Sequence, residues 1–191
     1  MRSPIHLEEN EPQSAQRVSE AYHHLSRVSL RDVGNTLSAD IQPGGILTIN
    51  DRLFSLFDAH CHTPSEHTVR GTPADLELHL VHQDSAGAIA VLAVLFDRSP
   101  GIHPVDVLIT PPPSAAPLDE PISVARLLPK DSRRFLYTGT RTTPPLTKGV
   151  RWLIYEDVQS VGTDALKIFA DRYGPNNHPI QPLGGRSVTL I

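Results

Sequence analysis

Short runs in which apolar and polar residues alternate fill the first third of the chain. They lie at 28–30, 36–41, 46–49 and 53–57, and the turn signals Gly34-Asn35 and Pro43-Gly44-Gly45 separate them. Alternation with a period of two is typical of strands that bury one face, and such glycine-containing pairs mark the turns between strands. This region is therefore predicted to form short strands joined by turns.

The middle of the chain predicts longer strands. Residues 56–62 and 76–82 are the central pair, and Val69-Arg70-Gly71-Thr72-Pro73 supplies a turn between them. The stretch from Ala88 to Phe96 is almost continuously apolar. A short apolar run of this kind is typical of a strand that is buried on both faces.

One amphipathic helix is predicted at about 163–173, with Thr163 as its N-cap and Gly174-Pro175 at its end. Leu166, Phe169 and Tyr173 share its apolar face. The predicted fold is therefore mainly β, with a large central, twisted, mostly antiparallel sheet and a few short peripheral helices.

The composition fits this fold and excludes several classes of function. The chain has 191 residues, enough for one domain, and its 18 prolines favour short strands over long helices. The formal net charge is -4 and no cluster of Lys and Arg stands out, so no nucleic-acid partner is expected. The stretch from Thr110 to Pro117 is predicted to be an extended connector.

The same composition bears on the cellular location. No apolar run reaches the roughly 20 residues that would span a membrane, and no apolar segment typical of a signal peptide follows Met1. The single cysteine, Cys61, cannot form an intrachain disulfide. As written, the chain is expected to be cytoplasmic, or periplasmic or secreted if its true N-terminus lies upstream.

Three histidines interrupt the two central strands. His60 and His62 are two residues apart, so on a strand they share a face while Cys61 points the opposite way. His79, from the neighbouring strand, would complete a site with three nitrogen ligands and one open position, which is typical of a catalytic zinc site.

An acidic residue stands two positions before two of these histidines. Asp58 precedes His60 and Glu77 precedes His79, so each carboxylate shares its histidine's face and can hold the second ring N–H. A chain with 10 histidines will also place some of them two apart by chance. The paired carboxylates favour a metal site over this structural alternative.

Several motifs around these residues resemble those of the α-carbonic anhydrase family. They are His60-Cys61-His62-Thr63-Pro64-Ser65-Glu66-His67-Thr68-Val69, Leu76-Glu77-Leu78-His79-Leu80-Val81-His82, Ala90 to Phe96, Thr142-Thr143-Pro144-Pro145-Leu146 and Gln181-Pro182-Leu183-Gly184-Gly185-Arg186. Ser3-Pro4-Ile5 also fits, so the resemblance covers nearly all of residues 1–191 as one carbonic anhydrase-like domain.

The resemblance implies a zinc enzyme. Zn²⁺ on the three histidines would supply a hydroxide that attacks carbon dioxide, giving bicarbonate and a proton. Thr142 would accept the hydroxide's proton in a hydrogen bond and donate its own to Glu66, with Tyr137 and Ser3 as supporting members of the network. The pocket residues that the resemblance implies are Val81, Val91 and Trp152 on the apolar wall and Thr143 on the polar side.

The chain also departs from the family pattern. Asn35 stands where fast members carry a proton-shuttling histidine, which leaves His6, His23 and His24 as candidates by proximity in sequence alone. Arg141 replaces a leucine beside the pocket and predicts lower turnover, and Asp58 replaces a neutral amide. The N-terminal aromatic segment of the family is missing, and a homo-oligomer could cover the surface beneath it.

Two other functions are alternatives. Asp58-Ala59-His60-Cys61-His62 resembles the first-strand motif of amidohydrolases, but that fold needs seven further βα units, for which too little chain follows. The second alternative is a catalytically weak or inactive carbonic anhydrase-like module that binds zinc or a partner. His67 and His82 are expected to be structural rather than ligands.

Overall fold

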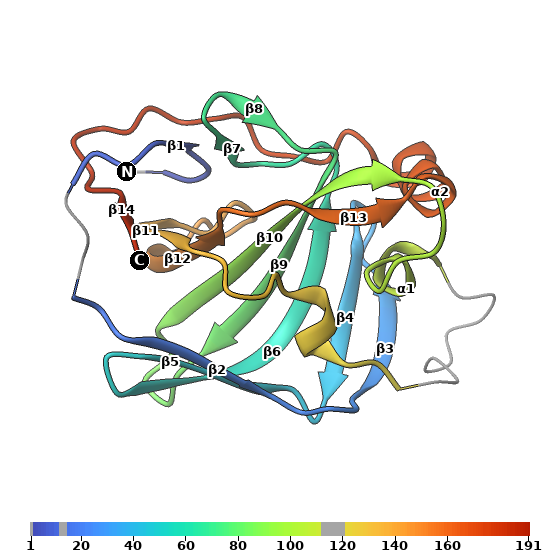
Figure 1. Cartoon of the computed structure of the whole chain (residues 1–191), viewed down its shortest axis with the longest axis horizontal. Helices are drawn as coiled ribbons and strands as arrows, with labels where there is room; N and C mark the ends of the chain where they lie inside the picture. Colours follow the sequence, from blue (N-terminus) through green and yellow to red (C-terminus); the bar gives the residue numbers. More distant parts are fainter. Residues whose placement is uncertain (1, 12–14, 112–120) are drawn as a thin grey trace.

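An eleven-stranded sheet organises the molecule in the computed structural model, which describes residues 2–11, 15–111 and 121–191. Its main path is β14-β11-β12-β10-β9-β6-β4-β3, with β13, β5 and β2 attached at the side (Figure 1). The strands are β2 Val18–Tyr22, β3 Arg27–Asp32, β4 Leu37–Gln42, β5 Gly45–Ile49, β6 Arg52–His62, β9 Leu76–Gln83, β10 Ile89–Ser99, β11 Arg134–Thr140, β12 Lys148–Tyr155, β13 Gln159–Gly162 and β14 Thr189–Leu190.

A smaller three-stranded sheet and three short helical elements complete the fold. The small sheet comprises β1 His6–Leu7, β7 Thr68–Val69 and β8 Thr72–Pro73, and the helical elements are α1 Asp106–Ile109, the 3₁₀ turn Val124–Leu127 and α2 Thr163–Tyr173. No helix in the described ranges is long and apolar enough to cross a membrane.

Most neighbouring strands in the large sheet are antiparallel, as predicted. The exceptions are β12 and β13, which both pair with β10 in parallel. The apolar stretch from Ala88 to Phe96 forms most of β10, whose residues 89–96 are all buried. The predicted runs at 53–57 and 56–62 form the single strand β6.

A β-bulge in β6 decides which way the histidines point. Leu56 pairs with His82, but the next pair is Asp58 with Val81, so Phe57 is an extra residue in the strand. Before the bulge the even-numbered residues of β6 face the core, whereas after it the odd-numbered ones do. The bulge thus turns His60 and His62 away from the core that holds Cys61.

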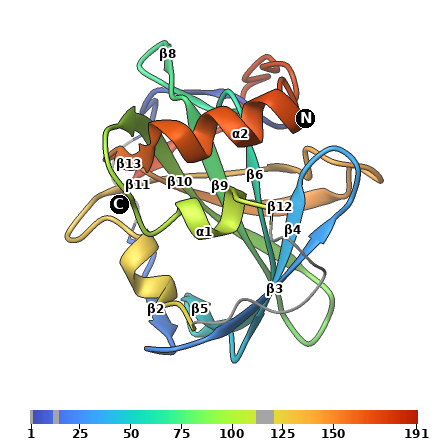
Figure 2. The ribbon, with the colours of Figure 1, turned by 90° about the vertical axis from the view of Figure 1, so that its right-hand side faces the viewer.

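The two faces of the sheet carry two separate apolar clusters. One includes Leu80 and Leu92 and is covered by α2, which contributes Leu166, Phe169 and Tyr173 as predicted (Figure 2). The other cluster packs Val81, Val91 and Trp152 on the face that the three histidines share.

Two local predictions can be compared with the structure. The predicted N-cap of α2 was wrong: Gly162 is the capping residue, and the Thr163 hydroxyl donates to Ser99 O instead. The predicted turn at 69–73 forms the β7–β8 hairpin, in which Arg70 and Gly71 both have positive φ. Residues 112–117 of the predicted connector lie outside the described residues.

Candidate metal centre

Three imidazoles from two adjacent strands converge on one point. The register pairs His60 of β6 directly with His79 of β9, and His62 lies opposite Glu77. The ring centroids are 5.2 Å apart for His60 and His62, 5.3 Å for His60 and His79, and 4.8 Å for His62 and His79. One nitrogen from each ring lies within 4.8 Å of the other two, so the predicted cluster is present.

The other nitrogen of each ring is held by an oxygen. His60 Nδ1 donates to Asp58 Oδ2 at 2.8 Å, and His79 Nε2 donates to Glu77 Oε1 at 2.7 Å. His62 Nδ1 donates to the Asn176 carbonyl at 3.0 Å. Such contacts fix the tautomer and leave His60 Nε2, His62 Nε2 and His79 Nδ1 as free acceptors.

The buried nitrogen of His62 tests whether a metal fits here. His62 Nε2 is buried and has no hydrogen-bond partner among the described residues, which is costly for a polar atom. Burial, together with the His79 and His60 rings, lowers the pKa of His62 well below its usual value. The ring is therefore neutral and keeps a lone pair for a cation. Three imidazoles that converge with one position left open suit Zn²⁺.

Glu77 is the most heavily hydrogen-bonded carboxylate of the site. It accepts from the backbone N–H groups of Glu66 and His67 and from the rings of His67 and His79. Burial alone would raise its pKa, but His67 and His79 hold the pKa of Glu77 well below its usual range. Conversely, burial alone would lower the pKa of His79, and Glu77 raises it.

A buried chain of hydrogen bonds leads from Glu77 to the N-terminal segment. His67 Nε2 lies 2.7 Å from the Tyr137 hydroxyl, which lies 2.8 Å from Ser3 Oγ. Tyr137 and Ser3 thus support the His79 side of the site through His67. His67, Glu77 and His79 also form a group that could hold a metal. The Glu77 oxygen there already bonds both rings, so this group is a hydrogen-bonded cluster.

Several neighbouring groups stabilise the negative charge of the Asp58 carboxylate. Besides His60, it accepts from the Ser38 hydroxyl at 2.5 Å, and Ser38 in turn accepts from Arg31 at 3.2 Å. Burial raises the pKa of Asp58, but His60, Ser38 and the charge of Arg141 together hold it below its usual value. Arg141 and Asp58 therefore offset each other's charge across the site.

The loop after β11 carries Arg141, Thr142 and Thr143 and follows Thr140, whose carbonyl accepts from Trp152 Nε1. Thr142 is buried, while Arg141 and Thr143 are half-buried. Glu66 Oε1 accepts from the His178 backbone N–H at 2.8 Å, and Glu66 Oε2 is buried with no hydrogen-bond partner among the described residues, 3.9 Å from His79 Nε2. Within the described ranges no hydrogen bond joins Thr142 to Glu66, so the bond that the resemblance implies stays a prediction.

The residues predicted to form an apolar wall lie together in one cluster. Val81, Val91 and Trp152 are all buried in one cluster, and the Trp152 ring lies 4.9 Å from the His79 ring. Trp152 Nε1 donates to Thr140 O at 2.9 Å, so the indole presents its apolar part to the imidazoles.

Comparisons with known proteins agree with this geometry. The profile of the eukaryotic-type carbonic anhydrase family matches residues 1–190. The chain belongs to the eukaryotic-type carbonic anhydrase family. It is 33% identical over 168 residues to a carbonic anhydrase of Neisseria gonorrhoeae, covering 85% of this chain and 67% of that protein.

Two further relatives support the same assignment. A carbonic anhydrase of Pectobacterium carotovorum is 29% identical over 160 residues, covering 81% of this chain and 66% of the relative. The α-carbonic anhydrase structure of Photobacterium profundum superposes with a TM-score of 0.90 at 30% identity, covering 98% of this chain and 88% of that one. The chain spans about two thirds of the length of the two bacterial sequence relatives.

The carbonic anhydrase site also depends on Asn176, which the sequence analysis missed. Its carbonyl holds His62, its Oδ1 accepts from Thr63 N at 2.7 Å, and its Nδ2 donates to Asn35 O at 2.8 Å. Asn176 precedes the closing motif by only a few residues, but nothing in the local pattern shows that it returns to the histidines. Asn35 is thereby linked through Asn176 to His62.

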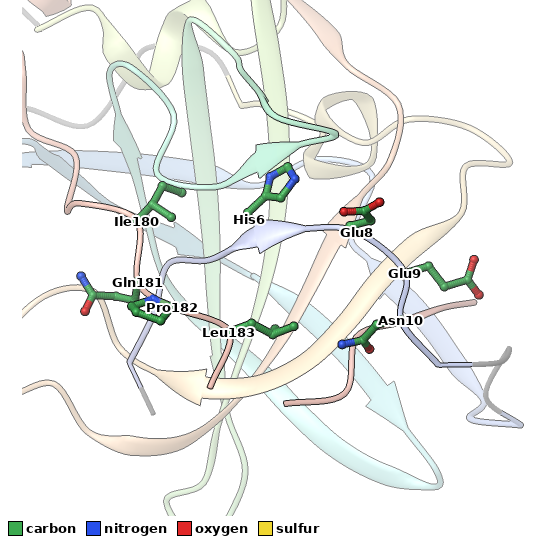
Figure 3. Close-up of a pocket in the computed structure, with 8 residues that line it drawn as sticks. All are labelled: His6, Glu8, Glu9, Asn10, Ile180, Gln181, Pro182 and Leu183. Carbon is green, nitrogen blue, oxygen red and sulfur yellow. The ribbon is translucent and has the colours of Figure 1, made fainter. Parts of the chain in front are cut away.

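The histidines proposed as alternative proton carriers are not joined to the site by any described contact. His6 is hydrogen-bonded to Thr68 Oγ1 at 2.8 Å. It lines a different pocket of about 630 Å³, between the N-terminal segment and residues 180–183 (Figure 3). His82 is buried, and its Nε2 contacts the Tyr22 hydroxyl at 2.9 Å.

Proposed function

We propose that this chain catalyses the reversible hydration of carbon dioxide to bicarbonate and a proton, with Zn²⁺ held by His60, His62 and His79. The observation that carries the proposal is the convergence of three imidazoles whose outer nitrogens are already fixed by Asp58, Glu77 and the Asn176 carbonyl. The partnerless, buried His62 Nε2 supports it because a bound cation would satisfy that atom. Membership of the carbonic anhydrase family supports the reaction.

A zinc ion bound there would lower the pKa of a coordinated water to about 7, so that a nucleophile is available at neutral pH. The role of the protein is to hold the three histidines in place and to orient the reactants. Asp58 and Glu77 act on the rings of His60 and His79, and both carboxylates are held ionised by their partners.

Thr142 and Glu66 are proposed to orient the nucleophile. An ionised carboxylate only accepts hydrogen bonds, and Glu66 Oε2 has no partner in the described structure. A Thr142 hydroxyl that donates to this oxygen keeps its own lone pairs for the reacting water. Thr142 would then accept that water's proton in a hydrogen bond and aim the oxygen at carbon dioxide.

The apolar wall is proposed to bind carbon dioxide. The molecule has no net dipole and gains little from charged partners, so the surface formed by Val81, Val91 and Trp152 suits it. This wall adjoins His79 through Trp152. Carbon dioxide held there would lie beside the metal centre.

A second candidate is a zinc-binding module with little turnover. Two observations favour it: Thr142 makes no hydrogen bond to Glu66 among the described residues, and an amide that cannot exchange protons near neutral pH, Asn35, stands at the shuttle position. The metal site alone does not separate this candidate from the enzyme.

The test combines two measurements on purified protein. Zinc content is determined by elemental analysis after dialysis, and carbon dioxide hydration is followed by stopped flow in concentrated buffer. The proposal predicts about one zinc per chain and hydration well above the uncatalysed rate. Zinc without hydration would favour the binding module, and a chain that takes up no zinc would contradict both.

A further inference from the structure

A small cavity lies on the face of the large sheet opposite the three histidines. It has a volume of about 320 Å³ and is lined by β13, by the loop before α1 and by the 3₁₀ turn Val124–Leu127. These segments lie together on one side of the molecule (Figure 2). Phe96, Val105 and Leu127 line the cavity and belong to the apolar cluster that α2 covers. The cavity is therefore separate from the candidate metal centre.

A buried carboxylate fixes one wall of this cavity. Asp106 Oδ2 accepts from the His103 backbone N–H at 2.9 Å, and Asp106 Oδ1 accepts from the Gly162 backbone N–H at 2.8 Å. A side chain at Gly162 would clash, because its Cβ would lie 2.3 Å from Asp106 Oδ2. The carboxylate thus holds the loop that carries His103 against the end of β13. The wall is formed before any ligand arrives, as is usual for a ligand site.

The register of β13 brings a free amide to the cavity. Gln159 pairs with Phe96 in the parallel β10–β13 ladder, so the two side chains lie on the same face of the sheet. Both residues line the cavity. Among the described residues the Gln159 amide has no hydrogen-bond partner. Its NH₂ group can therefore donate to a ligand.

Arg126 adds a positive charge to the lining of the same cavity. Its backbone N–H donates to Ser123 O at 3.1 Å, and its side chain is exposed and has no ion pair within the described ranges. Arg98, by contrast, is paired with Asp75. The described residues that line the cavity include no Asp or Glu. An anion that enters would meet a cation and no competing carboxylate among them.

We propose that this cavity binds a phosphate group, carried either by free phosphate or by a small phosphate monoester. The Arg126 guanidinium offers a planar fork of N–H donors that matches phosphate oxygens, and the Gln159 amide adds a neutral donor. The cavity volume is near the lower end of the range for ligand sites, so the ligand must be small. The inference does not depend on the proposed reaction, because the histidines lie on the other face of the sheet.

The experiment follows the backbone amide signals of isotope-labelled, zinc-loaded protein by nuclear magnetic resonance, which reports where a ligand binds. Inorganic phosphate is titrated at constant ionic strength, and glycerol 3-phosphate represents the monoesters in a second arm. The variants are Arg126→Gln, which removes the charge, and Gln159→Ala, which removes the amide donor. Arg27→Gln is the matched control, because Arg27 is exposed on β3.

We expect saturable shifts of the amide signals of His103, Gln159 and Gly162, and the ligand that binds more tightly identifies the source of the phosphate group. Arg126→Gln should weaken binding by about tenfold, because a charge-assisted contact is lost. Gln159→Ala should weaken it by a few fold, and Arg27→Gln should leave it unchanged. The rate of carbon dioxide hydration in Arg126→Gln should equal that of wild type.

Several outcomes would overturn the inference. Shifts confined to the signals of His60, His62 and His79 would place the phosphate at the metal centre instead. Wild-type affinity in Arg126→Gln, or an equal loss in Arg27→Gln, would show that Arg126 forms no specific site. If Arg126→Gln does not fold, Gln159→Ala decides, because loss of the amide donor must still weaken binding. Phosphate binding by a protein that does not hydrate carbon dioxide would contradict the proposed function alone.

Discussion

The two halves of the metal centre are built differently. On the strand side, His60, His62 and His79 each have one nitrogen fixed by a hydrogen bond of 2.7 to 3.0 Å. On the loop side, Thr142 has no hydrogen bond to Glu66 among the described residues, and the described hydrogen bond of the Arg141 side chain, to Thr143 Oγ1, is long at 3.4 Å.

The difference shows which task each half performs. A metal site needs ligands whose geometry is set before the ion arrives, and adjacent strands in fixed register supply it. Orienting a nucleophile and releasing a product depend on groups that change partners during the reaction, and these lie on a loop. Affinity for zinc and rate of turnover should therefore respond to different substitutions.

The largest expected effect comes from removing one of the three histidines on the strand side. In His62→Ala the zinc affinity should fall by at least about a hundredfold, because one of three ligands is lost, and carbon dioxide hydration should fall to background. Competition with a chromogenic chelator measures the affinity. His24→Ala is the control, since His24 is exposed. Zinc retained at wild-type affinity in His62→Ala would show that His62 is not a ligand.

Acid should lower the free energy of unfolding because of His82, which lies on β9 of the strand side. Burial lowers the pKa of His82 to about 4, against 6.5 in an unfolded chain. Between these values the unfolded chain binds the proton and the folded one does not, so stability falls as pH drops from 6.5 to 4. The loss attributable to His82 is about 3 kcal/mol.

Urea unfolding of wild type and His82→Gln at pH 7 and pH 4.5 measures this effect. The variant should lose less stability between the two pH values than wild type, whatever its stability at pH 7. His23→Gln, at an exposed position, serves as the control. The same pH dependence in His82→Gln as in wild type would contradict the assignment.

A substitution on the loop side should lower turnover without changing zinc binding. Thr142→Val keeps the size of the side chain and removes its hydroxyl, so zinc content should be unchanged while the hydration rate falls by about a hundredfold. Thr143→Val is a comparison on the same loop and should have a smaller effect. A full rate in Thr142→Val would mean that the Thr142 hydroxyl does not orient the nucleophile.

The smallest expected effect concerns proton transfer. Asn35→His places an imidazole at a position tied to Asn176 and should raise the hydration rate a few fold in dilute buffer, with little change in concentrated buffer. Stopped-flow measurements at several buffer concentrations test this. Asn35→Gln is the matched control, and an equal gain with Gln would rule out proton transfer by the ring.

Much of the strand side could be predicted from the sequence because its signals are local. The spacing of His60 and His62, the carboxylates two residues before His60 and His79, and the apolar run of β10 all depend on the period of a strand. The partner of His62 could not be predicted in this way. Asn176 is 114 residues further along the chain and acts through a backbone carbonyl, which any residue carries.

The geometry of the loop side could not be predicted in this way because it is tertiary. The sequence implied a hydrogen bond from Thr142 to Glu66, whereas Glu66 receives its described bond from the His178 backbone. The sequence showed Asp58 and Arg141 only as two separate departures from the family pattern. The structure instead brings the two charges near enough for Arg141 to stabilise the ionised Asp58.

The sequence by itself determined the candidate metal ligands, the mainly β fold and the family, because side-chain chemistry and a period of two are local properties of the chain. Only the tertiary structure decided how these residues meet. The bulge at Phe57 changes which face His60 and His62 occupy, and the register between β6 and β9 sets His60 against His79. Non-local pairing fixes both features, so no single segment of the chain contains them.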